Sequence, residues 1–582
     1  MPTHLKTLIL SLALALPICL TGAPVLAQSS DGTDTTTGTS TGATTGTEGS
    51  SGTGTETEVA LPPLTDLEKA IKERIENDQG TAGAGNTGDQ QLVALYTYYD
   101  GRRYKPIWVT ANGANTKALD FVDALFNSET DALYPEDYHI DVLSPMLNGK
   151  TLQELANLEV ELSKTLLVFG EHLSAGRVEP NKINREISMF PVAADPSRIL
   201  NGADTAENIE TLLARLAPQT PNYARLKVAL QEYRDKAAHG GWAEFPAGDV
   251  IKPNYSDATR VAALRKRMID GGDLKPGEHE GDIYDGALVE AVKRFQERHG
   301  LDVDGVIGPT TIKAMNVPAS VRVRQMELNM ERRRWMEDDL GSYYVFVNLA
   351  DQYLKVVDKE KTVHTARLVV GKPYHRTPVF TRKMTYTVIN PYWNVPFNIA
   401  VNEYLPKLRN NPGALAAQNI HVYLRGRQVS PYAVNWAGYG RREFPFRLRQ
   451  EPGRRNALGR IKFMFPNPFS VYIHDTPSKS LFKRSRRVFS HGCMRVQDPF
   501  DLAQVLLGHE GWDRKQIDRI AASGKQRVIK FKAPIPVHIT YLTAWVNKDG
   551  SVHFRADVYG RDKLLDKALT RVTGDDKKKK KS

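Results

Sequence analysis

The chain of 582 residues contains only two cysteines, Cys19 and Cys493. Cys19 lies in an apolar N-terminal run that we expect to be lost with a secretory leader, which leaves Cys493 alone. A lone cysteine excludes an intramolecular disulfide, so stability must come from packed cores. Such a thiol is either a reactive group or a buried residue that behaves as a small, inert hydrophobe.

Long hydrophobic runs are also absent beyond the N-terminus. Residues 1–27 have the parts of a secretory signal peptide, with Lys6, an apolar stretch over residues 8–20 and a small-residue end at Ala27. The apolar stretch is short for a membrane span, so we predict export, with an uncleaved anchor as the alternative.

The net charge of +11 is the next feature, and Lys577 to Lys581 supply five of those charges. The remaining charge still leans basic, with arginine clusters at residues 441–442, 454–455 and 483–487. Nucleic acid is an unsuitable partner for an exported protein. We therefore expect acidic polymers or substrate carboxylates as partners, although a solvated basic face would give the same composition.

Changes in composition and periodicity predict a multidomain α+β protein. A Thr/Gly/Ser-rich spacer cannot bury apolar area and should be disordered, apart from a short helix over residues 64–75. The insertion at 401–459 is rich in Pro, Gly and Arg and is expected to be a lid or binding loop. The predicted segments are a signal peptide (1–27), the spacer (28–90), an α-helical domain (91–250), a small helical domain (251–318), a β-rich domain (319–565) and a basic disordered tail (566–582).

The chemistry is concentrated in residues 471–496, VYIHDTPSKSLFKRSRRVFSHGCMRV. His474 ends a strand-like run, and Ser490-His491-Gly492-Cys493 is expected to lead into a helix. A nearby imidazole and a helix N-terminus both favour the thiolate, which is the nucleophilic form. Gly492 allows close backbone approach, so amides near Cys493 could donate to a developing oxyanion.

Two histidines compete for the role of general base. His491 is two residues from Cys493 and tends to point elsewhere, whereas His474 arrives from another strand and can face the sulfur, so we choose His474. The alternative is that both imidazoles only satisfy local hydrogen bonds. One cysteine with two histidines makes a poor zinc site, so we expect no metal and no cofactor.

At these residues the sequence resembles the L,D-transpeptidases, whose catalytic fold is called the YkuD domain. His474 and the run Ser490 to Arg495 carry the signature, and Met494 and Phe397-Asn398 depart from the common pattern. Residues 291–316 resemble a small peptidoglycan-binding module through the pattern FQxxxGLxxDGxxGPxT. Further similar segments are 370–373, 377–378, 390–396, 456–459, 466–467, 537–541 and 559–562.

The order of domains resembles the large Gram-negative branch of that family, over about residues 90 to 565. The resemblance implies a scaffold domain at 91–250, a peptidoglycan-binding-like domain at 251–318, a catalytic domain at 319–565 and a periplasmic location. Whether the small module binds the wall or only packs against its neighbours stays open.

The resemblance also implies roles for individual residues. Cys493 would be the acylated nucleophile and His474 its base, oriented by a backbone carbonyl such as that of Asp475. Arg495 would brace the loop or pair with a substrate carboxylate. The remaining implied residues are His491 and Gly492 at the oxyanion pocket, Ser490 in the same turn, and Tyr392, Trp393 and Asn394 along a donor groove, with a core position as the alternative for Trp393.

The implied reaction is attack on a peptidoglycan tetrapeptide stem, release of D-Ala and transfer of the acyl group from a thioester to a neighbouring stem. The expected product is a 3→3 cross-link, and the expected partners are stem peptides, with an envelope lipoprotein or other wall-synthesis enzymes as further candidates. Resolution by water would instead make an L,D-carboxypeptidase or a lipoprotein amidase. A wall-binding scaffold with a vestigial catalytic domain is the non-enzymatic alternative.

Overall fold

The computed structural model describes residues 61–81 and 88–579. The expected signal peptide, most of the spacer and residues 580–582 lie outside the described residues. Residues 566–579, which we predicted to be a disordered tail, form part of a helix instead. Within the described ranges, no helix has both the length and the apolar character that crossing a membrane requires. The described residues from Pro63 onward form one compact unit.

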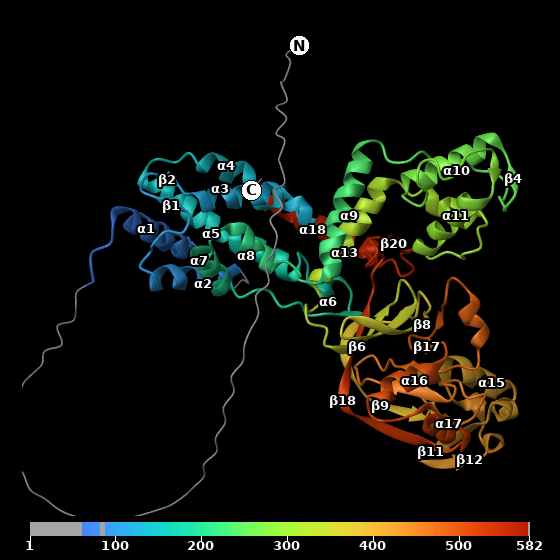
Figure 1. Cartoon of the computed structure of the whole chain (residues 1–582). Coiled ribbons are helices and arrows are strands. Elements are labelled where there is room, and N and C mark those ends of the chain that lie inside the picture. Colours follow the sequence, from blue (N-terminus) through green and yellow to red (C-terminus); the bar gives the residue numbers. More distant parts are fainter. Residues whose placement is uncertain (1–60, 82–87, 580–582) are drawn as a thin grey trace, which may run out of the picture. The chain divides into compact units, whose positions relative to one another are not determined.

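The first region is helical, as the apolar periodicity predicts, and α5 is its central helix (Figure 1). A capping box of Thr151 and Glu154 fixes the start of α5. The elements are α1 (Asp66–Thr81), α2 (Gly88–Gly101), β1 (Val109–Thr110), β2 (Gly113–Ala114), α3 (Thr116–Phe126), α4 (Ile140–Met146), α5 (Leu152–Ala175), α6 (Pro180–Ile183), β3 (Ile187–Ser188), α7 (Pro196–Thr205), α8 (Ile209–Leu216) and α9 (Pro221–Ala238).

The folded region begins earlier than the predicted boundary at residue 91. Helix α1 buries Leu67, Ile71 and Ile75 against α5, so it belongs to the helical core rather than to a disordered spacer. The spacing of these three residues places them on one face of the helix, which is why the helix packs. The expected short helix was right in kind but too short.

A buried carboxylate holds the aromatic segment that precedes α3. Glu159 on α5 accepts hydrogen bonds from the backbone N–H groups of Ile107 (2.5 Å) and Trp108 (2.9 Å) and from the hydroxyl of Tyr99 (2.5 Å). Burial raises the pKa of Glu159 to about 7, and these hydrogen bonds oppose the rise. Tyr99 and Trp108 lie in the core of the helical region.

The small helical module has a core of its own and docks on a hairpin near the C-terminus. Its elements are β4 (Tyr255–Ser256), α10 (Ala258–Asp270), β5 (Ile283–Tyr284), α11 (Gly286–Arg298) and α12 (Pro309–Met315). The ring of His299 stacks on Phe554 at 5.8 Å between centroids, and Arg555 donates to the carbonyl of Arg298 at 2.9 Å. One end of α11 is therefore used for packing.

A closed sheet forms the third region. Its strands follow the order β14-β15-β17-β8-β7-β6-β18-β9, and β14 also pairs with β9, so the sheet closes on itself. The elements are α13 (Ala319–Arg334), β6 (Tyr343–Asn348), β7 (Tyr353–Asp358), β8 (Lys361–Gly371), β9 (Val379–Ile389), β14 (Ile461–Met464), β15 (Ile473–His474), β16 (Val488–Ser490), β17 (Met494–Val496), α16 (Pro499–Gly508), α17 (Arg514–Ala522), β18 (Arg527–Thr540), β19 (Ala544–Val546), β20 (Val552–Phe554) and α18 (Arg561–Lys579).

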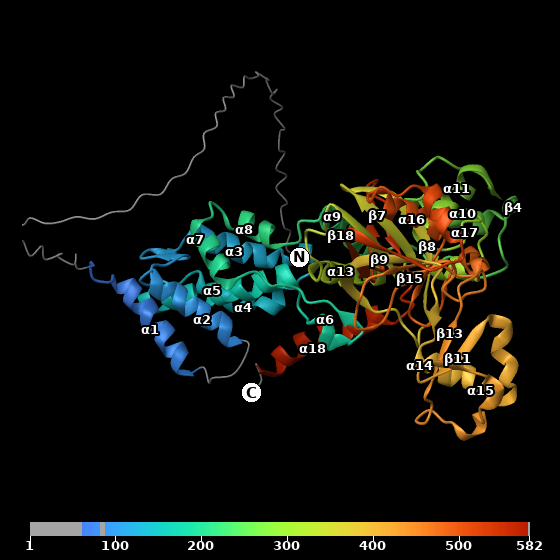
Figure 2. The same ribbon diagram turned by 90° about the horizontal axis from the view of Figure 1, so that it is seen from below.

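The insertion is a folded subdomain, which we call the cap, rather than the loop that the sequence suggested (Figure 2). Its strands pair in the order β10-β13-β11-β12 and cover a core that includes Trp393 and Trp436. The cap begins at β10, before the predicted start at residue 401. Its elements are β10 (Trp393–Asn394), α14 (Phe397–Ile399), the π-helical turn η3 (Ala400–Tyr404), α15 (Leu405–Asn410), β11 (Ile420–Leu424), β12 (Arg427–Val429) and β13 (Phe446–Gln450).

Candidate active site

Three charged or titratable side chains from neighbouring strands share one face of the closed sheet. His474 on β15 lies in register with Lys462 on β14 and with Arg495 on β17. Residues that face each other across paired strands point to the same side of a sheet. Cys493 immediately precedes β17, where the N–H of Met494 donates to the carbonyl of Tyr472 at 3.0 Å.

Tyr472 connects the thiol to the imidazole. Its hydroxyl hydrogen-bonds to the sulfur of Cys493, and its ring lies 5.6 Å from the ring of His474. Sequence reasoning missed Tyr472 and also Lys462, whose ammonium lies 5.7 Å from the tyrosine ring. The available signal was the alternation of an extended segment, because residues two apart, such as 472 and 474, point to the same side, although β15 itself begins at Ile473.

The thiol of Cys493 is protonated in this environment. Burial raises its pKa to about 11, against hydrogen bonds from Tyr472 and the charges of Arg495 and Lys462. The sulfur approaches the carbonyl of Ser470 at 3.8 Å, and the residue keeps some contact with solvent. The arrangement therefore holds a neutral thiol beside groups that would stabilise its anion.

His474 is neutral as well and has a defined tautomer. Its Nδ1 lies 2.5 Å from the carbonyl oxygen of Asp475, so Nδ1 donates and Nε2 is left as the acceptor. Burial, together with the charge of Arg495, lowers the pKa of His474 to about 3. Nε2 carries no proton at rest and can therefore accept one during a reaction.

The carboxylate of Asp475 is engaged inside the protein. It accepts hydrogen bonds from the backbone N–H groups of Arg460 (2.8 Å) and Thr476 (2.7 Å) and pairs with Lys479. Gly459 allows this packing, because a Cβ there would lie 2.2 Å from Asp475. Asp475 therefore orders the loop after His474, while its backbone carbonyl accepts from Nδ1 of His474.

The turn before the cysteine is fixed by Ser490. Its hydroxyl donates to the carbonyl of Cys493 at 2.5 Å and accepts from the N–H of Gly492 at 3.1 Å. Gly492 has φ of +114°, which disfavours any residue with a Cβ. The N–H of Gly492 is already bonded to Ser490. Its role at the oxyanion pocket therefore stays a prediction, and it requires this N–H to leave Ser490 and donate to the oxyanion.

The helix expected directly after Cys493 is absent. Strand β17 follows instead, because residues 494–496 pair with β15 and β8, and α16 begins only at Pro499. The argument that a helix N-terminus lowers the pKa of the thiol was therefore wrong. The remaining stabilisation of a thiolate comes from Tyr472, Arg495 and Lys462.

His491 faces the cap. Its Nε2 lies 2.7 Å from a carboxylate oxygen of Glu403 in η3, and its ring lies 5.0 Å from that of His375. Burial lowers the pKa of His491, while the carboxylate of Glu403 raises it. The contact links the turn that carries the nucleophile to the inserted subdomain.

Comparison with known proteins identifies the regions. Residues 93–230 match a scaffold domain family, residues 258–315 match the family described as "Putative peptidoglycan binding domain", and residues 342–529 match the L,D-transpeptidase catalytic domain, YkuD. Residues 342–529 belong to the L,D-transpeptidase catalytic family. The predicted resemblance and the predicted multidomain α+β fold are confirmed.

Individual relatives match parts of the chain. A "Putative L,D-transpeptidase" of Haemophilus influenzae is 32% identical over 246 residues, which are 42% of this chain and 49% of the relative. The amidase CwlL of Bacillus licheniformis is 38% identical over 68 residues, 12% of this chain and 19% of the relative. The chain thus spans about half the length of the first relative and about a fifth of the second.

Among solved structures, an L,D-transpeptidase fragment (residues 123–326) from Xylanimonas cellulosilytica is 16% identical. The similarity covers 50% of this chain and 98% of that one, with a TM-score of 0.17.

Arg495 has unused hydrogen-bonding capacity close to the thiol. Its Nε is buried and has no hydrogen-bond partner among the described residues. Burial lowers the pKa of Arg495, and interaction with Cys493 opposes this. Such a guanidinium can accept a carboxylate or an oxyanion as partner.

The predicted donor-groove residues separate in the structure. Trp393 is buried in the core of the cap, so its alternative as a packing residue is the one that the structure favours. Asn394 is exposed, and the guanidinium of Arg449 lies 4.7 Å from the ring of Tyr392. Among the described residues, no group of three His, Cys, Asp or Glu side chains could hold a metal ion.

Proposed function

We propose that this protein is a periplasmic peptidoglycan L,D-transpeptidase that forms 3→3 cross-links through a thioester on Cys493. The observation that supports the proposal most is the grouping of Cys493, His474 and Lys462 around Tyr472, with Arg495 in register with His474, within the region that matches the catalytic family. The adjoining peptidoglycan-binding match agrees with a wall substrate.

The resting site suggests how the reaction proceeds. Because both groups are neutral, the sulfur loses its proton to Nε2 of His474 as it attacks the carbonyl before the terminal D-Ala of a donor stem. The imidazolium returns the proton to the departing D-Ala nitrogen, and a thioester remains. The amine of a second stem then attacks, His474 again moves one proton, and the thiol is restored as the new amide forms.

Free carboxylates of the stem peptides fit the charge of this region. Arg495 offers its unpartnered Nε near the sulfur. Residues 401–459 of the cap contain ten Lys and Arg side chains and three Glu side chains. Five of these arginines have exposed side chains that make no hydrogen bond or ion pair among the described residues: Arg425, Arg427, Arg442, Arg447 and Arg454.

Hydrolysis of the same thioester is the second candidate. The partial solvent contact of Cys493 favours it, because water could reach the acyl carbonyl. The product would then be a shortened stem, and the protein would be an L,D-carboxypeptidase. An envelope lipoprotein is a third acceptor, which would make the protein a lipoprotein ligase or, in reverse, an amidase.

Purified protein incubated with disaccharide-tetrapeptides tests the proposal. We expect cross-linked dimers and released D-Ala by mass spectrometry, and neither product from Cys493→Ala. A carbapenem should leave one covalent adduct, located on Cys493. Shortened monomers without dimers would support hydrolysis, and products from Cys493→Ala would refute the cysteine mechanism.

A further inference from the structure

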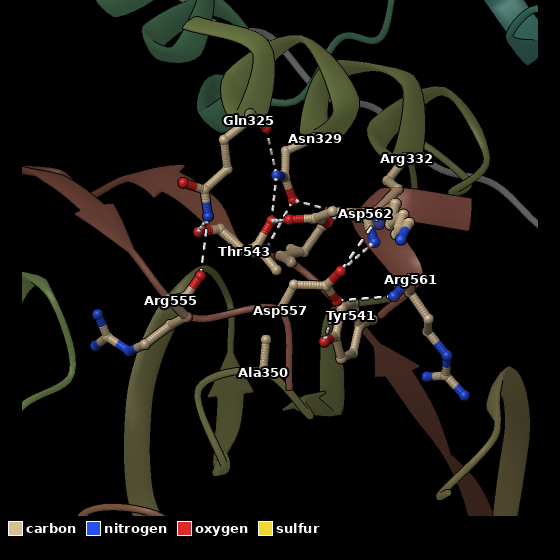
Figure 3. A network of polar contacts seen from close by, with 12 residues as sticks. Gln325, Asn329, Arg332, Ala350, Tyr541, Thr543, Arg555, Asp557, Arg561 and Asp562 are labelled. Atoms are coloured by element: carbon tan, nitrogen blue, oxygen red, sulfur yellow. Dashed lines mark hydrogen bonds and ion pairs between the residues drawn. The ribbon is translucent and has the colours of Figure 1, made fainter. Parts of the chain in front are cut away.

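A chain of hydrogen bonds leads from helix α13 to the turn that carries Cys493, and much of it lies outside the catalytic match at 342–529. In Figure 3, Asn329 and Arg332 of α13 point toward Thr543 and Asp562. Asn329 accepts the N–H of Thr543 at 2.8 Å, and Arg332 pairs with Asp562 at 2.5 Å. These bonds fix residues 541–562 against the helix.

Asp557 orders the end of this segment. Its carboxylate accepts the hydroxyl of Tyr541 (2.7 Å) and the backbone N–H groups of Arg561 (2.8 Å) and Asp562 (2.9 Å). The N–H of Tyr559 donates to the hydroxyl of Tyr541 at 3.0 Å. The network therefore fixes the backbones of Tyr559 and Arg561, and both side chains are buried.

Both side chains then hold the loop that follows β8. The hydroxyl of Tyr559 donates to the carbonyl of Gly371 at 2.7 Å, and Nη2 of Arg561 donates to the carbonyl of Thr377 at 2.9 Å. The same Nη2 lies 3.3 Å from Glu186, which precedes β3 in the helical region. A contact from the helical region thus reaches this loop.

Thr377 makes the final connection. Its buried hydroxyl accepts the N–H of Gly371 at 3.0 Å and donates to the carbonyl of Gly492 at 2.8 Å. Gly492 directly precedes Cys493 and has a left-handed φ, so the direction of its carbonyl determines where the next residue lies. A displacement of about 1 Å in a reacting group can lower a rate on the order of 100-fold.

We propose that Thr377 is a positioning residue for Cys493, and that Tyr559 and Arg561 hold Thr377 in place. The inference rests on the proposed function in that Cys493 is the reacting group. Under this inference, residues 559–561 help to determine where the sulfur of Cys493 lies, although they are outside the catalytic match.

Thr377→Val and Thr377→Ser form a matched pair for the test. Valine keeps the shape and loses the hydroxyl, whereas serine keeps the hydroxyl. We expect Thr377→Val to lower kcat for D-Ala release by about 10- to 100-fold at unchanged KM, and Thr377→Ser to stay within about threefold of the wild type. Alkylation of Cys493 by iodoacetamide should move to higher pH in the valine variant only, because the sulfur would lie less well against Tyr472 and Arg495.

Thr540→Val is the control for lost stability. Thr540 is also buried, and its hydroxyl donates to the carbonyl of Val347 at 2.8 Å, away from the turn. Thr540→Val should lower the melting temperature about as much as Thr377→Val does, but should leave the pH profile of Cys493 alkylation unchanged. Tyr559→Phe is a second test of the same inference. Alkylation of Cys493 should move to higher pH in this variant, as in Thr377→Val.

Two results would overturn the positioning role: a wild-type alkylation profile in folded Thr377→Val, or an equal shift in Thr540→Val. The proposed function fails separately if the wild type releases no D-Ala and forms no dimers, because the alkylation profiles need no substrate.

Discussion

Cys493 and His474 are held as a neutral pair. Burial favours the uncharged form of each group, which raises the pKa of the thiol to about 11 and lowers that of the imidazole to about 3. A preformed thiolate–imidazolium pair is therefore disfavoured before substrate binds. The proton must move as the sulfur attacks, and this distinguishes the site from thiols that are ionised at rest.

The neutral thiol predicts the pH dependence of its labelling. Because the folded pKa lies above neutrality, the thiolate fraction should rise about tenfold per pH unit between pH 6 and 9. Alkylation of Cys493 by iodoacetamide, followed by intact mass, should show this slope without a plateau. A plateau that begins below pH 7 would show a thiolate already present at rest.

Tyr472 should matter for reactivity more than for stability. Its hydroxyl hydrogen-bonds to the sulfur and would stabilise the thiolate, and a hydrogen bond to a charged group contributes about 1.5 to 3 kcal/mol. Tyr472→Phe should therefore slow acylation of Cys493 by about 10- to 100-fold. Tyr284→Phe, which loses a hydrogen bond to Gly305 in the small module, is the control and should acylate normally. Equal rates for wild type and Tyr472→Phe would remove Tyr472 from the mechanism.

At the level of elements, the sequence predicted types of structure better than their pairing. The helix α5 and the strands β6 to β8 follow from periodicity, because their buried faces repeat at 3.6 or 2 residues. The strand at 494–496 was missed, since it pairs with β8, whose residues lie more than a hundred positions away, and with β15, which lies 21 positions earlier in the chain. The fold of the cap was missed for a similar reason: Trp393 pairs with Gln450 across the whole insertion.

Glu159 predicts a pH-dependent stability of the helical region. Its folded pKa of about 7 lies above the ordinary value of 4.5, so the protonated form is favoured in the folded state. The stabilisation is fully present below about pH 4.5 and is lost as the pH rises through about 7. Melting temperatures between pH 5 and 8 should therefore fall more for the wild type than for Glu159→Gln. Parallel curves for the two proteins would contradict a neutral Glu159.

The contact between Glu403 and His491 predicts a link between the cap and the fate of the thioester. Glu403→Ala removes the carboxylate that lies 2.7 Å from His491 and should loosen η3 against the turn. Hydrogen–deuterium exchange over residues 400–408 should increase, and the ratio of hydrolysis to transfer should rise. Glu443→Ala is the matched control, because Glu443 is exposed in the cap and makes no ion pair among the described residues. Unchanged exchange in Glu403→Ala would show that the contact does not hold the cap.

At the scale of the whole molecule, the catalytic strands depend on regions far from them in sequence. Glu186 of the helical region reaches Arg561, and Arg555 holds one end of the small module through the carbonyl of Arg298. The nucleophile and its neighbouring histidines could be chosen from residue types and spacing alone. Tyr472, Lys462 and Thr377 could not, because their roles depend on strand register and loop packing.

The most direct test is to trap the acyl-enzyme. The protein should be mixed with disaccharide-tetrapeptide, quenched in acid within one turnover, and analysed by intact mass and peptide mapping. The account predicts an adduct equal to the substrate less D-Ala on Cys493, with much slower formation in His474→Ala. Cross-linked product from Cys493→Ala, or an adduct formed as fast in His474→Ala as in the wild type, would contradict it.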